Sequence, residues 1–187
     1  STVLTDAPER RRAGREIGSF ASTQKKIAEA RFFLDLLTKE ERRIFGDKNP
    51  FDYYLSAFLS SARTVDWRLR HEQAAIYPIW RSAWDASLTA EDNALIKFMV
   101  DDRNQEVHES GSLRTVGQEG IGLPIGESHI DGCIVTTSGP PGMPPTVAYK
   151  PTYSFTVGGT ERNATDAAAA FLALLQRMVE KFEADHP

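Results

Sequence analysis

Apolar residues recur at every third or fourth position in four long stretches of the chain, which places them on one face of an α-helix. The stretches begin near Ser22, Phe51, Thr89 and Asn163. The second stretch is the most regular, and its apolar face consists of Phe51, Tyr54, Leu55, Phe58, Ala62, Val65 and Leu69. The pattern predicts long helices that bury these faces against one another.

A shorter stretch, residues 76–86, repeats this spacing with aromatic side chains at Tyr77, Trp80 and Trp84. Large aromatic residues at helical spacing are typical of a core or an interface. Pro78 agrees with a helix that begins just before it, because proline is tolerated in a first turn. With this element the chain holds four to five helices.

Polar residues at the starts of the stretches fit helix capping. We expect Ser22 or Thr23 to cap the first helix, Thr89 the fourth, and Asn163 or Thr165 the last. The side-chain oxygens of these residue types accept hydrogen bonds from backbone N–H groups in a first turn. The capping residues and the periodicity therefore predict the same boundaries.

The composition changes between residues 111 and 160, which hold ten of the thirteen glycines. Two runs here, residues 130–137 and 146–157, are rich in Val, Ile, Thr, Tyr and Phe, as β-strands are. We expect them to pair across a loop at residues 138–145. The predicted fold class is mainly α, a bundle of four to five helices with a β-hairpin inserted between the last two.

The remaining glycines of this segment predict irregular structure. Gly117, Gly120, Gly122 and Gly126 do not match a phosphate-binding motif and precede a strand, so we expect a mobile loop there. The pair at residues 158–159 predicts a turn at the end of a strand.

The length of 187 residues and the 41% hydrophobic content suit one domain with a sizeable core. Residues 1–20 are polar and lack periodicity, and we expect them to form a mobile N-terminal tail that precedes a single domain at residues 21–187. A basic cluster in the tail consists of Arg10, Arg11, Arg12 and Arg15. We interpret it as a solvated segment, with contact to RNA or to a partner as the alternative.

Several features favour a cytoplasmic protein with no membrane association. No run of about 18 apolar residues predicts a membrane-spanning helix, and the N-terminus lacks the apolar segment of a signal peptide. Cys133 is the only cysteine, so no intramolecular disulfide can form, and we expect its side chain to be packed in the core. The net charge of -4 gives no overall attraction to nucleic acid, so a polyanion would need a local basic patch.

The fourth helix ends in a group of residues suited to phosphodiester chemistry: Arg103, Asn104 and His108. Asn104 and His108 share a helix face, and Arg103 lies about 140° from His108 around the axis, within reach of a long side chain at a helix end. A guanidinium can bind phosphate oxygens, an imidazole can transfer a proton near neutral pH, and an amide can orient either group. We take these three residues as the candidate catalytic site.

An Arg followed by Asn and, after three more residues, by His resembles the motif of the HEPN superfamily. The resemblance covers residues 22–110 and includes the earlier helix at residues 51–63, which reads FDYYLSAFLSSAR. It implies a helical domain that dimerises and needs no cofactor, and that is a metal-independent endoribonuclease of a toxin–antitoxin, defence or RNA-processing system. Other members only bind nucleotides or partners. The chain departs from the compact family pattern after His108, where Gly111 and the strands follow.

Cleavage of RNA by attack of a 2′-hydroxyl needs one group that accepts a proton and another that donates one. Each chain offers a single motif histidine, His108. We therefore expect a homodimer that brings two copies of the helix together, with the paired Arg103 side chains stabilising charge on the phosphoryl group.

Three alternatives remain beside this hypothesis. Arg103 could pair with Asp102 or Glu106 while His108 stabilises the helix end, which would make the group purely structural. The domain could be catalytically silent and bind a nucleotide or a partner, such as a nucleotidyltransferase or an antitoxin. His129 and Asp131, spaced for one strand face, could join His108 in a metal site, but two such residues are commonplace, and we expect no metal.

Overall fold

The computed structural model describes residues 20–45, 47, 49–108, 114–140 and 146–186, and it leaves the side chains of residues 101–108 undescribed. Within these ranges the helices are α1 (Ala21–Arg42), α2 (Asn49–Glu72), α3 (Tyr77–Ser87), α4 (Ala90–His108) and α5 (Ala164–Asp185). The strands are β1 (Thr115–Leu123), β2 (Gly126–Ile130), β3 (Cys133–Thr137), β4 (Thr146–Val157) and β5 (Thr160–Asn163). The predicted tail, with its four arginines, falls almost wholly on residues 1–19, outside these ranges.

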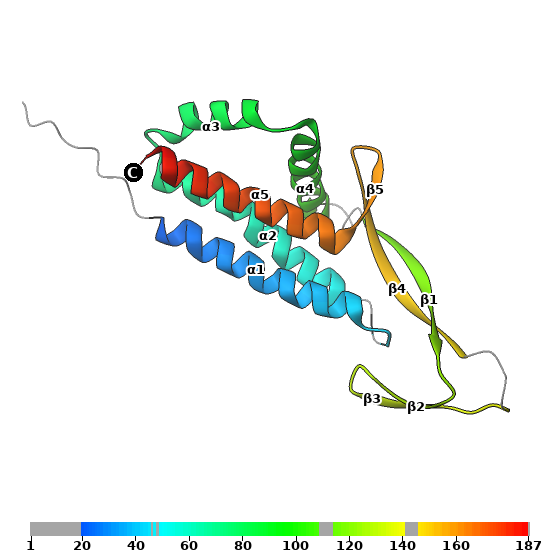
Figure 1. Ribbon diagram of the computed structural model, residues 1–187. Helices are drawn as coiled ribbons and strands as arrows, with labels where there is room; N and C mark the ends of the chain where they lie inside the picture. Colours follow the sequence, from blue (N-terminus) through cyan, green and yellow to red (C-terminus); the bar gives the residue numbers. More distant parts are fainter. Residues whose placement is uncertain (1–19, 46, 48, 109–113, 141–145, 187) are drawn as a thin grey trace, which may run out of the picture.

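Helices α1, α2 and α5 run along one another and form the body of the molecule (Figure 1). Their predicted apolar faces are buried as expected. The core includes Ile27, Ala30, Leu37, Leu55, Phe58, Ala62, Val65, Leu69, Phe171, Leu175, Met178 and Phe182. The helical periodicity therefore identified these three elements and the sides on which they pack.

The ends of the helices follow the predicted capping in two of three cases. The side chain of Asn163 accepts a hydrogen bond from the backbone N–H of Asp166 at 2.9 Å, and the hydroxyl of Thr89 accepts one from Asp92 at 3.0 Å. The prediction for α1 is wrong, because this helix starts at Ala21 and has no side-chain cap from its own first turn.

A carboxylate from another helix takes the place of the missing cap. Glu72, at the end of α2, accepts hydrogen bonds from the backbone N–H groups of Ser22 and Thr23 at 2.9 and 3.1 Å, and from the hydroxyl of Thr23. A negative charge at a helix N-terminus also interacts favourably with the helix dipole. The contact joins the start of α1 to the end of α2.

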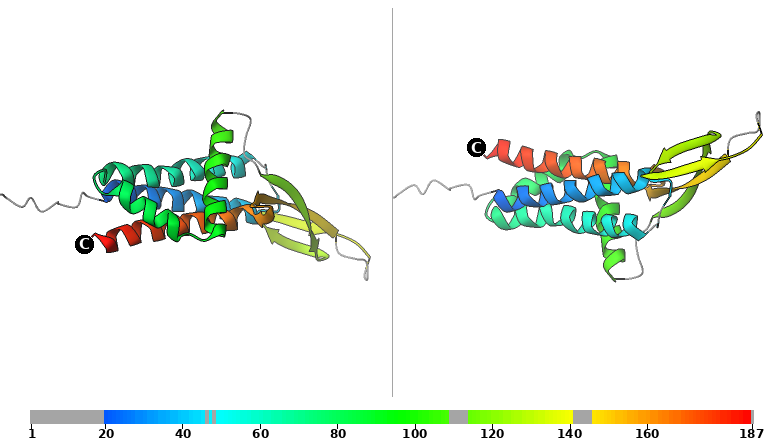
Figure 2. Two further views of the ribbon diagram at one scale, coloured as in Figure 1. Left: turned by 90° about the horizontal axis from the view of Figure 1, so that it is seen from above. Right: turned by 90° about the horizontal axis from the view of Figure 1, so that it is seen from below.

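Helix α4 does not run along the others but crosses α5 and α2, and its C-terminal end extends past α2 (Figure 2). Leu95 and Met99 are buried beneath the crossing, and the ring of Phe98 lies 5.0 Å from that of Phe155 in β4. None of the described helices combines the length and apolar composition needed to cross a bilayer.

The expected fold class is wrong in the region between α4 and α5. In place of one hairpin, the described residues form a three-stranded antiparallel sheet in the order β1-β4-β5 and a separate pair, β2-β3. The segment predicted to be a mobile loop is largely β1, which pairs with β4 from Thr115 opposite Ser154 to Leu123 opposite Thr146. Pairing with a distant strand outweighed the low strand propensity of the β1 glycines.

The two predicted strands do not pair with each other. Residues 130–137 belong to a hairpin of their own, β2-β3, which turns at Asp131 and Gly132 with φ of 53° and 77°. Positive φ at both positions matches the tight turn that an Asp-Gly pair favours. The predicted turn at Gly158 and Gly159 is confirmed, and it joins β4 to β5.

Contacts at the start of β1 attach the three-stranded sheet to the helices. The guanidinium of Arg114 pairs with Asp52 of α2 through two hydrogen bonds and lies 5.5 Å from the ring of Tyr153. The hydrogen bonds that Arg114 donates to Asp52 raise the pKa of Arg114 above its usual value. The ring of Tyr153 also stacks on that of Phe51, with the ring centres 3.6 Å apart.

Replacement of Glu72 by Ala should lower the free energy of unfolding by about 1–2 kcal/mol, the usual effect of removing a helix cap. The reason is that the change removes the acceptor for two N–H groups of α1. Urea denaturation followed by circular dichroism would measure the change. Glu180→Ala, which removes an exposed carboxylate from α5, is the matched control and should have little effect; equal losses in both variants would contradict the capping role.

Candidate functional site

The candidate catalytic residues Arg103, Asn104 and His108 occupy the last turns of α4. Their side chains lie outside the described residues, so the structure places them by backbone only. It neither brings the three functional groups together nor separates them. The same holds for the acidic neighbours Asp102 and Glu106, with which the structural alternative would pair Arg103.

The helical repeat relates these residues to the described part of α4. Asn104 and Arg103 follow Val100 by four and three residues, which places them about 40° and about 60° from it on either side of the helix. Ile96, Val100, Asn104 and His108 succeed one another in steps of four. The face of α4 that carries Ile96 and Val100 therefore continues into Arg103 and Asn104, whereas His108 lies about 80° from Val100 around the axis.

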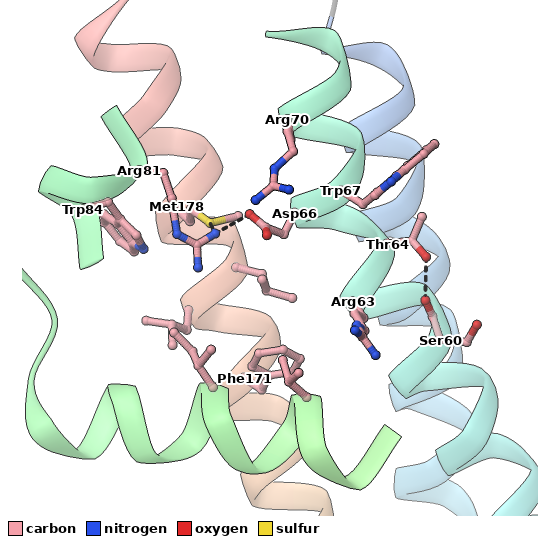
Figure 3. A pocket seen from close by; sticks show the side chains of 14 residues that line it. Ser60, Arg63, Thr64, Asp66, Trp67, Arg70, Arg81, Trp84, Phe171 and Met178 are labelled. Atoms are coloured by element: carbon pink, nitrogen blue, oxygen red, sulfur yellow. Dashed lines mark hydrogen bonds and ion pairs between the residues drawn. The ribbon is translucent and has the colours of Figure 1, made fainter. Parts of the chain in front are cut away.

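Ile96 and Val100 line a pocket of about 700 Å³ between α2, α3, α4 and α5 (Figure 3). The floor is apolar and comes from the buried face of α5, and the walls carry both arginine and tryptophan side chains. The described lining residues are Ser60, Arg63, Thr64, Asp66, Trp67, Arg70, Arg81, Trp84, Ile96, Val100, Phe171, Leu174, Leu175 and Met178.

One wall of the pocket contains a network of hydrogen bonds centred on Arg81. Its guanidinium pairs with Asp66 of α2, and also donates to Asp85 at 2.7 Å and to the hydroxyl of Tyr77 at 2.7 Å. The hydroxyl of Tyr77 donates in turn to Asp66. The network holds α3 against α2 at this side of the pocket.

Electrostatics fix the protonation states within the network. Burial and the neighbouring charge of Asp66 raise the pKa of Tyr77, so its phenol stays neutral and remains a donor. Burial alone would lower the pKa of Arg81, but Asp66 and Asp85 outweigh it and raise that pKa above the usual value. Arg81 therefore keeps its positive charge beside an apolar floor.

The α2 side of the pocket is cationic and aromatic. Arg63 and Arg70 are exposed, and the ring of Trp67 is 50% exposed, lying 4.1 Å from the ring of His71. The guanidinium of Arg68 lies 5.0 Å from the centre of the Trp67 ring. Positive charge and an exposed indole thus occur together along the second half of α2.

The sequence contains a sign of this surface beside the core stripe of α2. Ser60, Arg63, Thr64, Trp67 and Arg70 recur at the same three- and four-residue spacing as the core stripe, on another side of the helix. A tryptophan on an otherwise polar helix face is the unusual feature, because a ring of this size normally contributes to a core or an interface. Of the aromatic residues predicted to be core in α3, Tyr77 and Trp80 are buried, whereas Trp84 is only partly buried and lines the pocket.

The other residues considered for chemistry lie in the β-region. His129 is exposed on β2, where it pairs with Glu127 at 3.1 Å, and Asp131 accepts hydrogen bonds from the backbone of Ile44 and Phe45. Among the described residues, no three His, Cys, Asp or Glu side chains gather closely enough to hold a metal. Cys133 is exposed, so the prediction that its side chain is packed in the core was wrong.

Comparison of the chain with models of known protein families, with curated proteins and with solved structures finds no match.

Replacement of Arg81 by Leu should lower the free energy of unfolding by about 2 kcal/mol, because Asp66 would remain partly buried without its counter-charge. The double variant Arg81→Leu with Asp66→Leu should lose less than the sum of the two single changes. Urea denaturation of the four proteins would give the coupling energy.

The matched control for this cycle is the exposed pair of Arg177 and Asp92, whose charged atoms lie 3.3 Å apart. Exposed ion pairs contribute little, so Arg177→Leu should change stability by less than about 0.5 kcal/mol. Additive losses for Arg81 and Asp66 would contradict the network as a coupled unit.

Proposed function

We propose that this protein is a HEPN-like, metal-independent endoribonuclease that acts as a homodimer through the C-terminal part of α4. The observation that supports the proposal is the position of the motif on α4. The face of α4 that lines an arginine-bearing pocket at Ile96 and Val100 continues, by the helical repeat, into Arg103 and Asn104, and His108 follows one turn later. RNA phosphates would then meet cationic side chains on both α2 and α4.

The three motif residues divide the chemistry between them. The 2′-hydroxyl of the substrate attacks the adjacent phosphorus and displaces the 5′-oxygen of the next nucleotide, which leaves a 2′,3′-cyclic phosphate. His108 transfers a proton in this reaction. Arg103 binds the phosphoryl oxygens as negative charge accumulates in the transition state, and Asn104 orients the phosphate or the imidazole.

A homodimer supplies the second proton-transfer group. One copy of His108 can accept the proton of the 2′-hydroxyl while the other donates to the leaving oxygen. The course of α4 supports this arrangement, because its C-terminal end extends past α2 (Figure 2). Association of two such ends about a two-fold axis would place both motif copies near one phosphate.

Purified protein should cleave single-stranded RNA in the presence of EDTA, and His108→Ala or Arg103→Ala should lower the rate by about 100-fold or more, the usual contribution of general acid–base and electrostatic catalysis. Gel electrophoresis of a labelled oligonucleotide would measure the rates. The same oligonucleotide made of DNA should stay intact, because it lacks the attacking hydroxyl.

Two variants serve as matched controls for this experiment. His129→Ala removes an exposed histidine from β2, and Arg31→Ala removes an exposed arginine from α1; both should retain full activity. Equal activity in all variants would identify a contaminating nuclease or another site. A monomeric mass by light scattering at the assay concentration would exclude the composite site.

A further inference from the structure

The pocket between α2, α3, α4 and α5 combines an apolar floor with cationic walls, and its described residues form a site without any contribution from the catalytic motif. The floor consists of Phe171, Leu174, Leu175 and Met178, each no more than 6% exposed. Ile96 and Val100 of α4 extend this apolar surface along one side. A volume of about 700 Å³ lies within the range of pockets that bind small organic molecules.

Aromatic side chains border the pocket on two helices. Trp84 comes from α3 and Trp67 from α2, on opposite sides of the floor (Figure 3). The ring of Trp84 is held in place by Trp80, which stacks on it at 5.8 Å with an interplanar angle of 11°. A flat apolar group can therefore lie against a fixed indole and an aliphatic floor.

Among the described residues that line the pocket, arginines outnumber carboxylates, although the whole chain carries a net charge of -4. Three arginines line the pocket, and Asp66, already bound to Arg81 and Tyr77, is the one carboxylate among the described lining residues. The guanidinium of Arg70 lies 5.8 Å from the centre of the Tyr77 ring. Among the described residues, no carboxylate forms an ion pair with it. A cation at the edge of an apolar cavity is complementary to an anion that carries an apolar body.

We propose that this pocket binds a small amphipathic anion, a flat apolar molecule with one anionic group such as an aromatic carboxylate or sulfonate. The apolar body contacts the α5 floor and Trp84, and the anionic group binds the guanidinium of Arg70. This site goes beyond the nuclease proposal, because it requires neither Arg103, Asn104 nor His108. A second protein chain fits the site less well, since the floor is recessed among four helices and is already nearly buried.

Binding can be tested with 8-anilinonaphthalene-1-sulfonate, an aromatic sulfonate that fluoresces in apolar surroundings. Excitation of tryptophan should transfer energy to one bound probe per chain, because two of the three tryptophans line the pocket and the third stacks on one of them. N-phenyl-1-naphthylamine, which has the same rings and no sulfonate, should bind about tenfold more weakly, since a charge-assisted hydrogen bond is lost.

Arg70→Gln should weaken binding of the sulfonate about tenfold and leave binding of the neutral probe unchanged. The matched control is Arg31→Gln, an exposed arginine of α1 outside the pocket, which should bind both probes as the parent protein does. Thermal unfolding of each variant shows whether the fold is retained. His108→Ala should not alter binding, which separates this test from that of the nuclease.

Three results would overturn the proposal. One is equal affinity of Arg70→Gln and the parent protein for the sulfonate. Another is equal affinity of the parent protein for the charged and the neutral probe. The third is a dimer that does not bind the probe and that gains a binding site for it when dilution separates the two chains. A second copy of the chain would then be the occupant of the pocket.

Discussion

The packing of α5 against α1 and α2 is the interaction on which the rest of the structure depends. One face of α5 is buried along its whole length, from Ala167 to Phe182, and the helix contacts α1, α2, α4, β4 and β5. After α4 the chain leaves the helices to form the five strands, and it returns to them at Asn163, just before α5. The β-region is therefore held beside the bundle at both of its ends, and the inner face of β4 covers the helices with Tyr153, Phe155 and Val157.

The same arrangement explains why a pocket exists. A helix laid across others covers only the part of their surface beneath the crossing, whereas α1 contacts α2 along its length (Figures 1 and 2). Leu95 and Met99 fill the space under α4, and α3 covers the far end of α2 through Tyr77 and Arg81. Between these two covered regions the faces of α2 and α5 remain open, and this opening is the pocket.

The sequence predicted the helices well because helical periodicity is local and each stripe lies on one buried face. It predicted the sheets poorly because their pairing is not local. Thr115–Leu123 contains Gly117, Gly120 and Gly122, a composition that favours a loop, yet it forms a nine-residue ladder with β4. Gly117 even suits that ladder, since a Cβ there would lie 2.7 Å from the hydroxyl of Thr152. The turn at Asp131 and Gly132 is different, because its Asp-Gly pair is a local signal that the sequence does contain.

The net charge of the chain does not predict the electrostatic potential at the pocket. Screening limits charge interactions at physiological ionic strength to about 8–10 Å, so the groups within that range determine what a surface attracts. Over the rest of the surface many carboxylates pair with nearby cations, as in Lys26 with Glu29 and Arg162 with Glu91. Among the described residues that line the pocket are three arginines and one carboxylate, Asp66, which pairs with Arg81. A chain with a net charge of -4 can therefore present arginine side chains around an apolar pocket, and α4, the helix of the candidate catalytic residues, borders that pocket with Ile96 and Val100.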